Sequence, residues 1–96
     1  MRVPMRAQIT CFVDTLTSRG VTRNISQNGI QVELPELKRK ANVRLTFRLP
    51  LSGTIVDAVG TTVWSLERRH GIKFQYMGEQ SLESIQHFIE DSTEQD

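Results

Sequence analysis

Hydrophobic and polar residues alternate along most of the first 77 residues of the chain. In the first segment, apolar side chains occupy the odd positions from Val3 to Val13, and Arg6, Gln8 and Thr10 lie between them. A period of two is typical of a β-strand with one buried face. The same alternation recurs over residues 43–49. The pattern therefore predicts half-buried strands in both segments.

Turn-forming residues separate several further strands. Residues 21–25 and 30–34 are apolar or β-branched and flank a short polar stretch, which predicts a tight hairpin. The other elements predicted from the sequence are turns at residues 18–20, 52–53 and 67–70, and strands over residues 54–66 and 71–76. Gly60 falls inside the longest of these strands, where a glycine commonly marks a bulge or a sharp bend.

The period changes near the C-terminus. Apolar side chains there recur at the spacing of one helix face, at Leu82, Ile85, Phe88 and Ile89. This spacing predicts a helix over residues 81–91 with Ser81 as its N-cap, followed by a polar tail over residues 92–96. Many short strands followed by one helix suggest a small antiparallel barrel or sandwich, with the helix covering one mouth or face.

Composition narrows the classes of function. The 96 residues are enough for one domain, and the net charge of +1 argues against a dedicated nucleic-acid binder. A barrel for single-stranded nucleic acid would also expose several aromatic residues on a basic face. No apolar run approaches the roughly 18 residues of a membrane span, so no membrane insertion is expected. The single cysteine, Cys11, is expected to be a buried small hydrophobe in a reducing cytoplasm.

Nothing in the sequence indicates catalysis. His70 and His87 have no cysteine partners at ligand spacing, so neither a metal nor a cofactor is expected. No pair of carboxylates stands out from the polar background. The chain is therefore predicted not to be an enzyme.

The most informative motif is Asn24-x-Ser26-x-x-Gly29, which lies in the predicted hairpin. Asn and Ser bond to their own backbone in turns, and glycine accepts the positive φ that a turn often requires. That interpretation alone makes the motif structural. However, Arg2 and Arg6 precede it at the spacing R-x-x-x-R.

Two further motifs follow in a fixed order. Residues 60–64 read G-T-T-V-W and residues 71–74 read G-I-K-F, and the predicted helix comes after them. The ordered set resembles the PilZ domain, a family of bacterial receptors for the second messenger cyclic di-GMP. The resemblance extends from Arg2 to about Ile89.

The resemblance implies both a fold and a role. It implies a mainly β fold, a six-stranded antiparallel PilZ-type barrel over residues 7–77 with one C-terminal helix, in a single domain of residues 1–96. Residues 1–6 would form a flexible arginine segment that folds over ligand held on the barrel. The domain would bind cyclic di-GMP in the cytoplasm and relay the signal to an effector protein or to another domain of a longer parent chain.

The family's ligand contacts carry over to Arg2, Arg6, Asn24, Ser26 and Gly29. Arginine suits such a ligand because its fork binds phosphate or a guanine edge bidentately and its plane stacks on a base. Asn24 stands where Asp is commoner in the family. An amide accepts through one oxygen only, so weaker binding is expected.

Two alternatives stay open. Arg2 and Arg6 could be the two arginines of the motif, or Arg2 could be the second of them and Arg6 an outward-facing strand residue. In the latter case the first arginine is missing. It could belong to an upstream segment, or the chain could be a degenerate PilZ-like interaction module that does not bind nucleotide. Trp64 has two interpretations as well, as packing at the end of a strand or as a platform beside a bound base.

Overall fold

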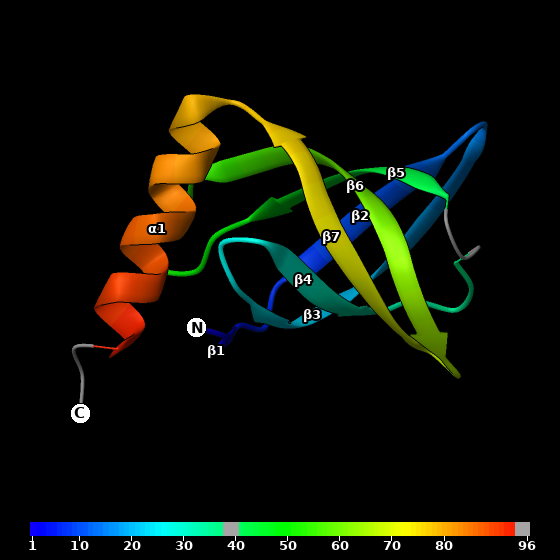
Figure 1. Cartoon of the computed structure of the whole chain (residues 1–96), viewed down its shortest axis with the longest axis horizontal. Helices are drawn as coiled ribbons and strands as arrows, with labels where there is room; N and C mark the ends of the chain where they lie inside the picture. The colour runs from blue at the N-terminus through cyan, green and yellow to red at the C-terminus, as the bar shows by residue number, and fades with distance from the viewer. Residues whose placement is uncertain (38–40, 94–96) are drawn as a thin grey trace.

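The computed structural model of the chain describes residues 1–37 and 41–93 and contains seven strands and one helix (Figure 1). In chain order they are β1 (Val3–Pro4), β2 (Gln8–Val13), β3 (Leu16–Ile25), β4 (Gly29–Glu33), β5 (Asn42–Arg48), β6 (Ile55–Leu66), β7 (Arg69–Met77) and α1 (Glu79–Thr93).

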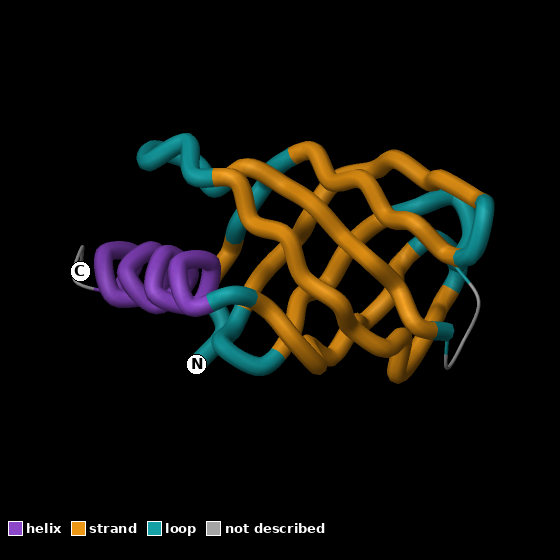
Figure 2. The backbone as a smooth tube through the Cα atoms, turned by 90° about the horizontal axis from the view of Figure 1, so that it is seen from above, coloured by secondary structure: helices purple, strands orange, loops and turns teal. Residues whose placement is uncertain are grey.

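Six of the strands close into an antiparallel barrel. Their order is β3-β2-β5-β6-β7-β4, and β4 pairs back with β3. The short strand β1 adds to β3 beside this ring. Figure 2 shows the strands wrapping around one another, with α1 at one end of the barrel. The predicted six-stranded barrel with a single C-terminal helix is confirmed.

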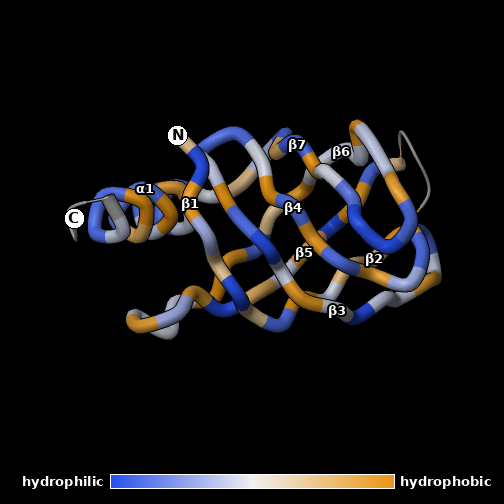
Figure 3. Tube along the Cα trace, turned by 90° about the horizontal axis from the view of Figure 1, so that it is seen from below, coloured by the Kyte–Doolittle hydropathy of each residue, from blue (hydrophilic) through white to orange (hydrophobic). Residues whose placement is uncertain are grey.

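Alternate residues of the strands point into the barrel and form its core. Val43, Leu45 and Phe47 of β5 are buried, and so are Ile85 and Ile89 of α1. The alternation of hydrophobic and hydrophilic positions along the strands is visible in Figure 3. The helix therefore contributes an apolar face to the core, as its period predicted, but Leu82 at the start of that face is exposed.

Cys11 of β2 belongs to the same core, and only 1% of it is exposed. Burial raises the pKa of its thiol to about 12, because the interior disfavours the thiolate. The prediction of a buried, hydrophobic cysteine is confirmed.

The first predicted strand is interrupted. Val3 and Met5 are buried as expected, but the residues between Pro4 and Gln8 do not belong to a strand. The hydroxyl of Thr22 fills the break: it donates to the carbonyl of Met5 (2.7 Å) and accepts from the amide of Ala7 (2.8 Å). Thr22 thus pairs with backbone groups that a continuous strand would have paired. Residues 3–5, predicted as part of a flexible segment, pack against β3 in this structure.

The turn predicted at residues 18–20 is wrong. These residues lie within β3, and the chain reverses instead at residues 14–15. Asp14 has φ of 54°, and aspartate adopts this left-handed conformation more readily than most residues. The predicted turn at residues 67–70 is shorter than expected, since β7 already begins at Arg69. The bulge expected at Gly60 is confirmed by a register shift between Val59 and Gly60.

The helix begins two residues earlier and ends two residues later than predicted. Ser81 therefore lies inside the first turn and is not the N-cap. Glu79 opens the helix, where its negative charge interacts favourably with the helix dipole. Residues 92–93, predicted as tail, are helical, and the rest of that predicted tail lies outside the described residues.

Candidate functional site

The Asn24–Gly29 motif forms the connection between β3 and β4. The amide of Ser26 donates to the carbonyl of Gly29 (2.9 Å), which closes the turn. The Ser26 hydroxyl accepts from the amides of Asn28 (3.3 Å) and Gly29 (3.2 Å). The carbonyl of Asn28 accepts from the amide of Phe74 on β7 (2.8 Å). Ser26 thus holds the turn, and the turn is tied to the neighbouring strand.

Gly29 serves close packing and not a positive φ. Of the glycines in the described parts of the chain, Gly53 alone has a positive φ. Gly29 lies opposite Lys73 in the β4–β7 pair, and a Cβ on it would be 2.6 Å from the carbonyl oxygen of Ile72. The motif therefore requires glycine here so that β4 can lie close to β7.

Asn24 carries an acceptor that none of the described residues uses. Its Nδ2 donates to Oε1 of Gln31, its partner on β4, at 3.1 Å, beside a register shift in the β3–β4 ladder. Its Oδ1 is buried and has no hydrogen-bond partner among the described residues. A buried acceptor without a partner is unfavourable by about 1–3 kcal/mol. Oδ1 is therefore a candidate contact for a donor that comes from outside the domain.

An open pocket of about 460 Å³ lies beside this turn, between the N-terminus, β4, β6 and β7. Its lining includes Arg2, Ser26, Gly29, Gln31, Trp64 and Lys73, and it is called the motif pocket below. The N-terminus and β1 lie toward the α1 end of the barrel (Figures 1 and 3).

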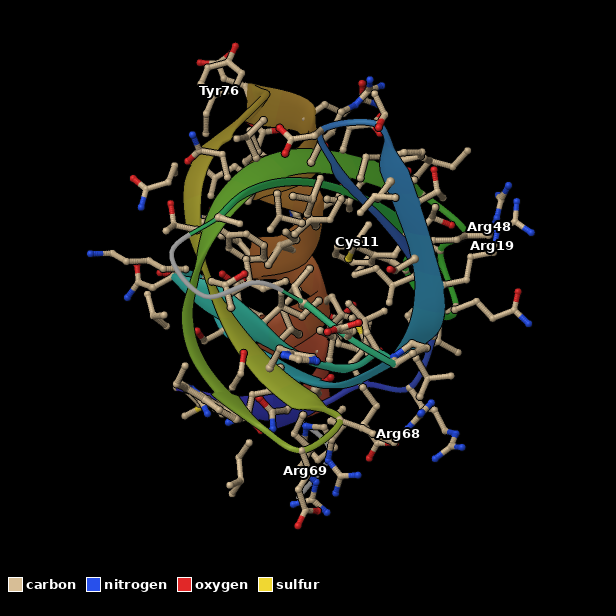
Figure 4. The ribbon with its side chains drawn as sticks, turned by 90° about the vertical axis from the view of Figure 1, so that its right-hand side faces the viewer. Cys11, Arg19, Arg48, Arg68, Arg69 and Tyr76 are labelled. Carbon is tan, nitrogen blue, oxygen red and sulfur yellow. The ribbon has the colours of Figure 1, made fainter. Side chains whose placement is uncertain are left out.

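Two cations give the motif pocket its positive charge. Arg2 and Lys73 are both exposed, and neither forms an ion pair with a described residue. Elsewhere on the barrel, by contrast, Arg23 of β3 pairs with Glu33 of β4, and Arg69 of β7 approaches the same carboxylate at 3.9 Å. Figure 4 shows Arg68 and Arg69 together near the β6–β7 turn. An anion would thus meet uncompensated positive charge at the motif pocket.

Trp64 packs against the neighbouring strand and also borders the motif pocket. It lies opposite Gly71 in the β6–β7 pair, and a Cβ on Gly71 would be 2.0 Å from Nε1 of the indole. The indole therefore packs directly over the glycine. The residue is half-buried and also lines the motif pocket, so part of it is available to a ligand.

Arg6 lies elsewhere. It lines a separate, shallow cleft of about 230 Å³ with Pro4, Thr22, Arg23 and Asn24. Of the residues predicted to contact ligand, Arg2, Ser26 and Gly29 share the motif pocket. Asn24 is joined to that pocket through its bond to Gln31, and Arg6 is outside it.

Lys73 and Gln31 are pocket residues that sequence reasoning missed. Lys73 stands in the G-I-K-F motif, but its position beside Gly29 depends on the register of β4 against β7. Gln31 faces Asn24 only because of the β3–β4 register. The alternation of apolar and polar residues identifies the buried face of each strand, but it does not specify which residues of two strands lie opposite each other.

Two further searches of the described residues, which leave out 38–40 and 94–96, bear on the class of site. They contain no cluster of His, Cys, Asp and Glu that could hold a metal ion. They also contain no helix that is both long and apolar enough to cross a membrane.

The fold and the pocket define a small β-barrel domain with one terminal helix and an open, positively charged ligand pocket. The family model described as PilZ domain matches residues 1–91, and the chain belongs to this family of cyclic di-GMP receptors. Its members are regulatory binding domains.

Solved structures show the same fold. The inhibitor of motility MotI/DgrA from Bacillus subtilis superposes with a TM-score of 0.83 at 17% identity, over 98% of this chain and 50% of that protein. The PilZ domain of CeSA from a cellulose-synthesizing bacterium gives a TM-score of 0.75 at 16% identity, over 95% and 96%. This chain thus spans half the length of MotI/DgrA. A search of curated proteins gave no significant match.

Proposed function

We propose that this domain binds cyclic di-GMP at the motif pocket and acts as a non-enzymatic switch. The ligand carries two phosphates and two guanines, so its receptor needs cations, acceptors for guanine N–H groups and flat surfaces. Arg2 and Lys73 supply the cations, and Arg2 can also bind a phosphate or a guanine edge through its fork. Asn24, which adjoins the pocket through its bond to Gln31, supplies an acceptor. Trp64 supplies a flat surface for a base.

One observation carries the proposal. Arg2 and the turn from Ser26 to Gly29 are distant in sequence, yet they line one open pocket. In the family, arginines from the N-terminal segment and residues of this motif contact the ligand together. The convergence of Arg2 with the motif turn is what that mode of binding requires.

A route from the pocket to a partner also exists in the fold. Arg2 immediately precedes β1, which pairs with β3 and contacts α1. Ligand that holds Arg2 would therefore restrain a segment packed against the helix, and a changed helix surface could be read by an effector protein or by another domain of a longer chain. The proposal places this receptor in the cytoplasm.

A second candidate is a PilZ-like interaction module that does not bind nucleotide. Two observations favour it: Arg6 lies outside the motif pocket, and the Ser26 hydroxyl is already engaged within its turn. In this case Asn24, Ser26 and Gly29 would serve the hairpin alone.

Amide NMR spectra recorded during a titration with cyclic di-GMP separate the two candidates. The receptor predicts saturable shifts confined to residues 2–5, 24–31, 63–64 and 71–73. The Arg2→Ala variant should need far more ligand for the same shifts. Spectra that do not change at millimolar ligand would contradict the receptor and favour the interaction module.

A further inference from the structure

The side-chain amide of Asn24 is oriented by one hydrogen bond. Its Nδ2 donates to Oε1 of Gln31 at 3.1 Å, and the two residues are direct partners in the β3–β4 ladder. The bond uses the nitrogen end of the amide. The oxygen end, Oδ1, is the buried atom that has no partner among the described residues.

This arrangement changes what the asparagine can recognise. A free asparagine amide offers both donors and an acceptor, and it can rotate to suit either kind of ligand group. Here the oxygen of Gln31 engages the nitrogen end, so rotation of the Asn24 amide alone would bring two oxygen atoms against each other. In this arrangement Asn24 presents an acceptor, as an aspartate would.

We propose that Gln31 is a positioning residue: it orients the side-chain amide of Asn24 so that Asn24 recognises guanine. This inference rests on the proposed binding of cyclic di-GMP. The Watson–Crick edge of guanine presents two adjacent donors, N1–H and the 2-amino group, and an oxygen acceptor suits both. Adenine presents an acceptor, N1, beside its amino group. The lone pair of N1 would face Oδ1 of Asn24, and the two acceptors would repel each other. The bond from Asn24 to Gln31 therefore favours guanine over adenine.

Three variants of Gln31 test this role. Gln31→Glu keeps only acceptors, so it holds the Asn24 nitrogen as the wild type does. Gln31→Lys supplies only donors, so it would attract Oδ1 and turn the nitrogen outward. Gln31→Met has nearly the same length, makes no comparable bond and leaves the amide free to rotate.

The readout is the ratio of the dissociation constants of cyclic di-AMP and cyclic di-GMP. Both ligands carry the same charge, so the charge added by Glu or Lys affects both constants alike and cancels in the ratio. We expect the wild type and Gln31→Glu to prefer cyclic di-GMP to a similar extent. The preference should fall roughly fivefold to tenfold in Gln31→Met, as for the loss of one oriented hydrogen bond, and further in Gln31→Lys.

The orientation itself can be measured without ligand. A coupling across the hydrogen bond from Asn24 Nδ2 to the side-chain carbonyl carbon of Gln31 is expected in the wild type. A coupling in the opposite sense, from Gln31 Nε2 to the side-chain carbonyl of Asn24, would overturn the inference.

Failure of the inference and failure of the proposed function look different. Equal selectivity ratios for Gln31→Glu and Gln31→Lys, in proteins that bind cyclic di-GMP, would overturn the role of Gln31 and leave the receptor intact. A wild-type chain that binds neither dinucleotide would contradict the proposed receptor function, and with it the inference that Asn24 recognises guanine.

Discussion

Two buried oxygen atoms lack hydrogen-bond partners among the described residues, and they lie in very different places. Oγ1 of Thr62 is inside the barrel, where the residue has 0% exposure. Oδ1 of Asn24 belongs to a residue that lines an open cleft and bonds to a residue of the motif pocket. The unfavourable energy is of the same kind in both places, but only Asn24 adjoins space that a ligand can enter.

The rest of the interior shows how unusual such atoms are in this fold. Thr22 is as well buried as Thr62, yet its hydroxyl bonds to two backbone groups. His70 is buried as well, with Nδ1 2.8 Å from the Ser65 hydroxyl and Nε2 3.4 Å from the carbonyl of Leu34. The comparison teaches that changes in the sealed interior should alter stability, and changes near the pocket should alter binding.

Gly29→Ala should have the largest effect on stability, although Gly29 lines the motif pocket. A Cβ 2.6 Å from the Ile72 carbonyl oxygen forces β4 and β7 apart. We expect a loss of about 2 kcal/mol in the free energy of unfolding, measured by urea denaturation. Gly78→Ala is the matched control, since a Cβ there meets nothing within 4 Å. Equal stability of the two variants would contradict the close packing of β4 on β7.

Asn24→Ala should separate binding from stability. The variant loses the bond to Gln31 but also removes an acceptor that has no partner, so the free energy of unfolding should change by less than about 0.5 kcal/mol. Affinity for cyclic di-GMP should fall about tenfold, as expected for a lost contact to a guanine N–H group. Unchanged affinity in calorimetric titration would remove Asn24 from the site.

Cys11 should make the domain less stable in alkali. Its pKa rises from 9.0 to about 12 in the folded state, so above pH 9 the unfolded chain releases a proton that the folded chain retains. Stability should therefore fall with rising pH through this window, by roughly 1 kcal/mol at pH 10. Cys11→Ala, compared by urea denaturation across the same pH range, should lack this decline. A parallel decline in both proteins would show that other groups cause it.

Thr62→Val should change stability in the opposite direction. The change removes the unpartnered hydroxyl and keeps the shape of the side chain, so the free energy of unfolding should rise by up to about 1 kcal/mol. Binding of cyclic di-GMP should not change. Destabilisation in thermal or urea unfolding would mean that the hydroxyl has a partner in solution, and the contrast with Asn24 would be lost.

Much of the fold could be predicted from the sequence because a period of two identifies the buried face of each strand. The alternation predicted β5 and β6 well and placed Val3, Met5 and Cys11 in the core. The first turn was misplaced because glycine at position 20 suggests a turn, whereas Asp14 takes the left-handed conformation.

The candidate site was less predictable, because it depends on pairing between distant strands. The motif drew attention to Asn24, Ser26 and Gly29 and indicated that Ser26 bonds within the turn. Its spacing could not show that Gly29 packs closely on β7 instead of taking a positive φ. The contributions of Lys73 and Gln31 follow from strand registers that no local pattern specifies.

The most direct test of the account is calorimetric titration of cyclic di-GMP into the wild type, Arg2→Ala and Arg68→Ala. Arg68 is an exposed arginine at the β6–β7 turn and does not line the motif pocket, so it controls for general loss of positive charge. The account predicts saturable binding that weakens about 100-fold in Arg2→Ala, as for a lost charged contact, and is unchanged in Arg68→Ala. No binding by the wild type, or equal binding by all three proteins, would contradict it.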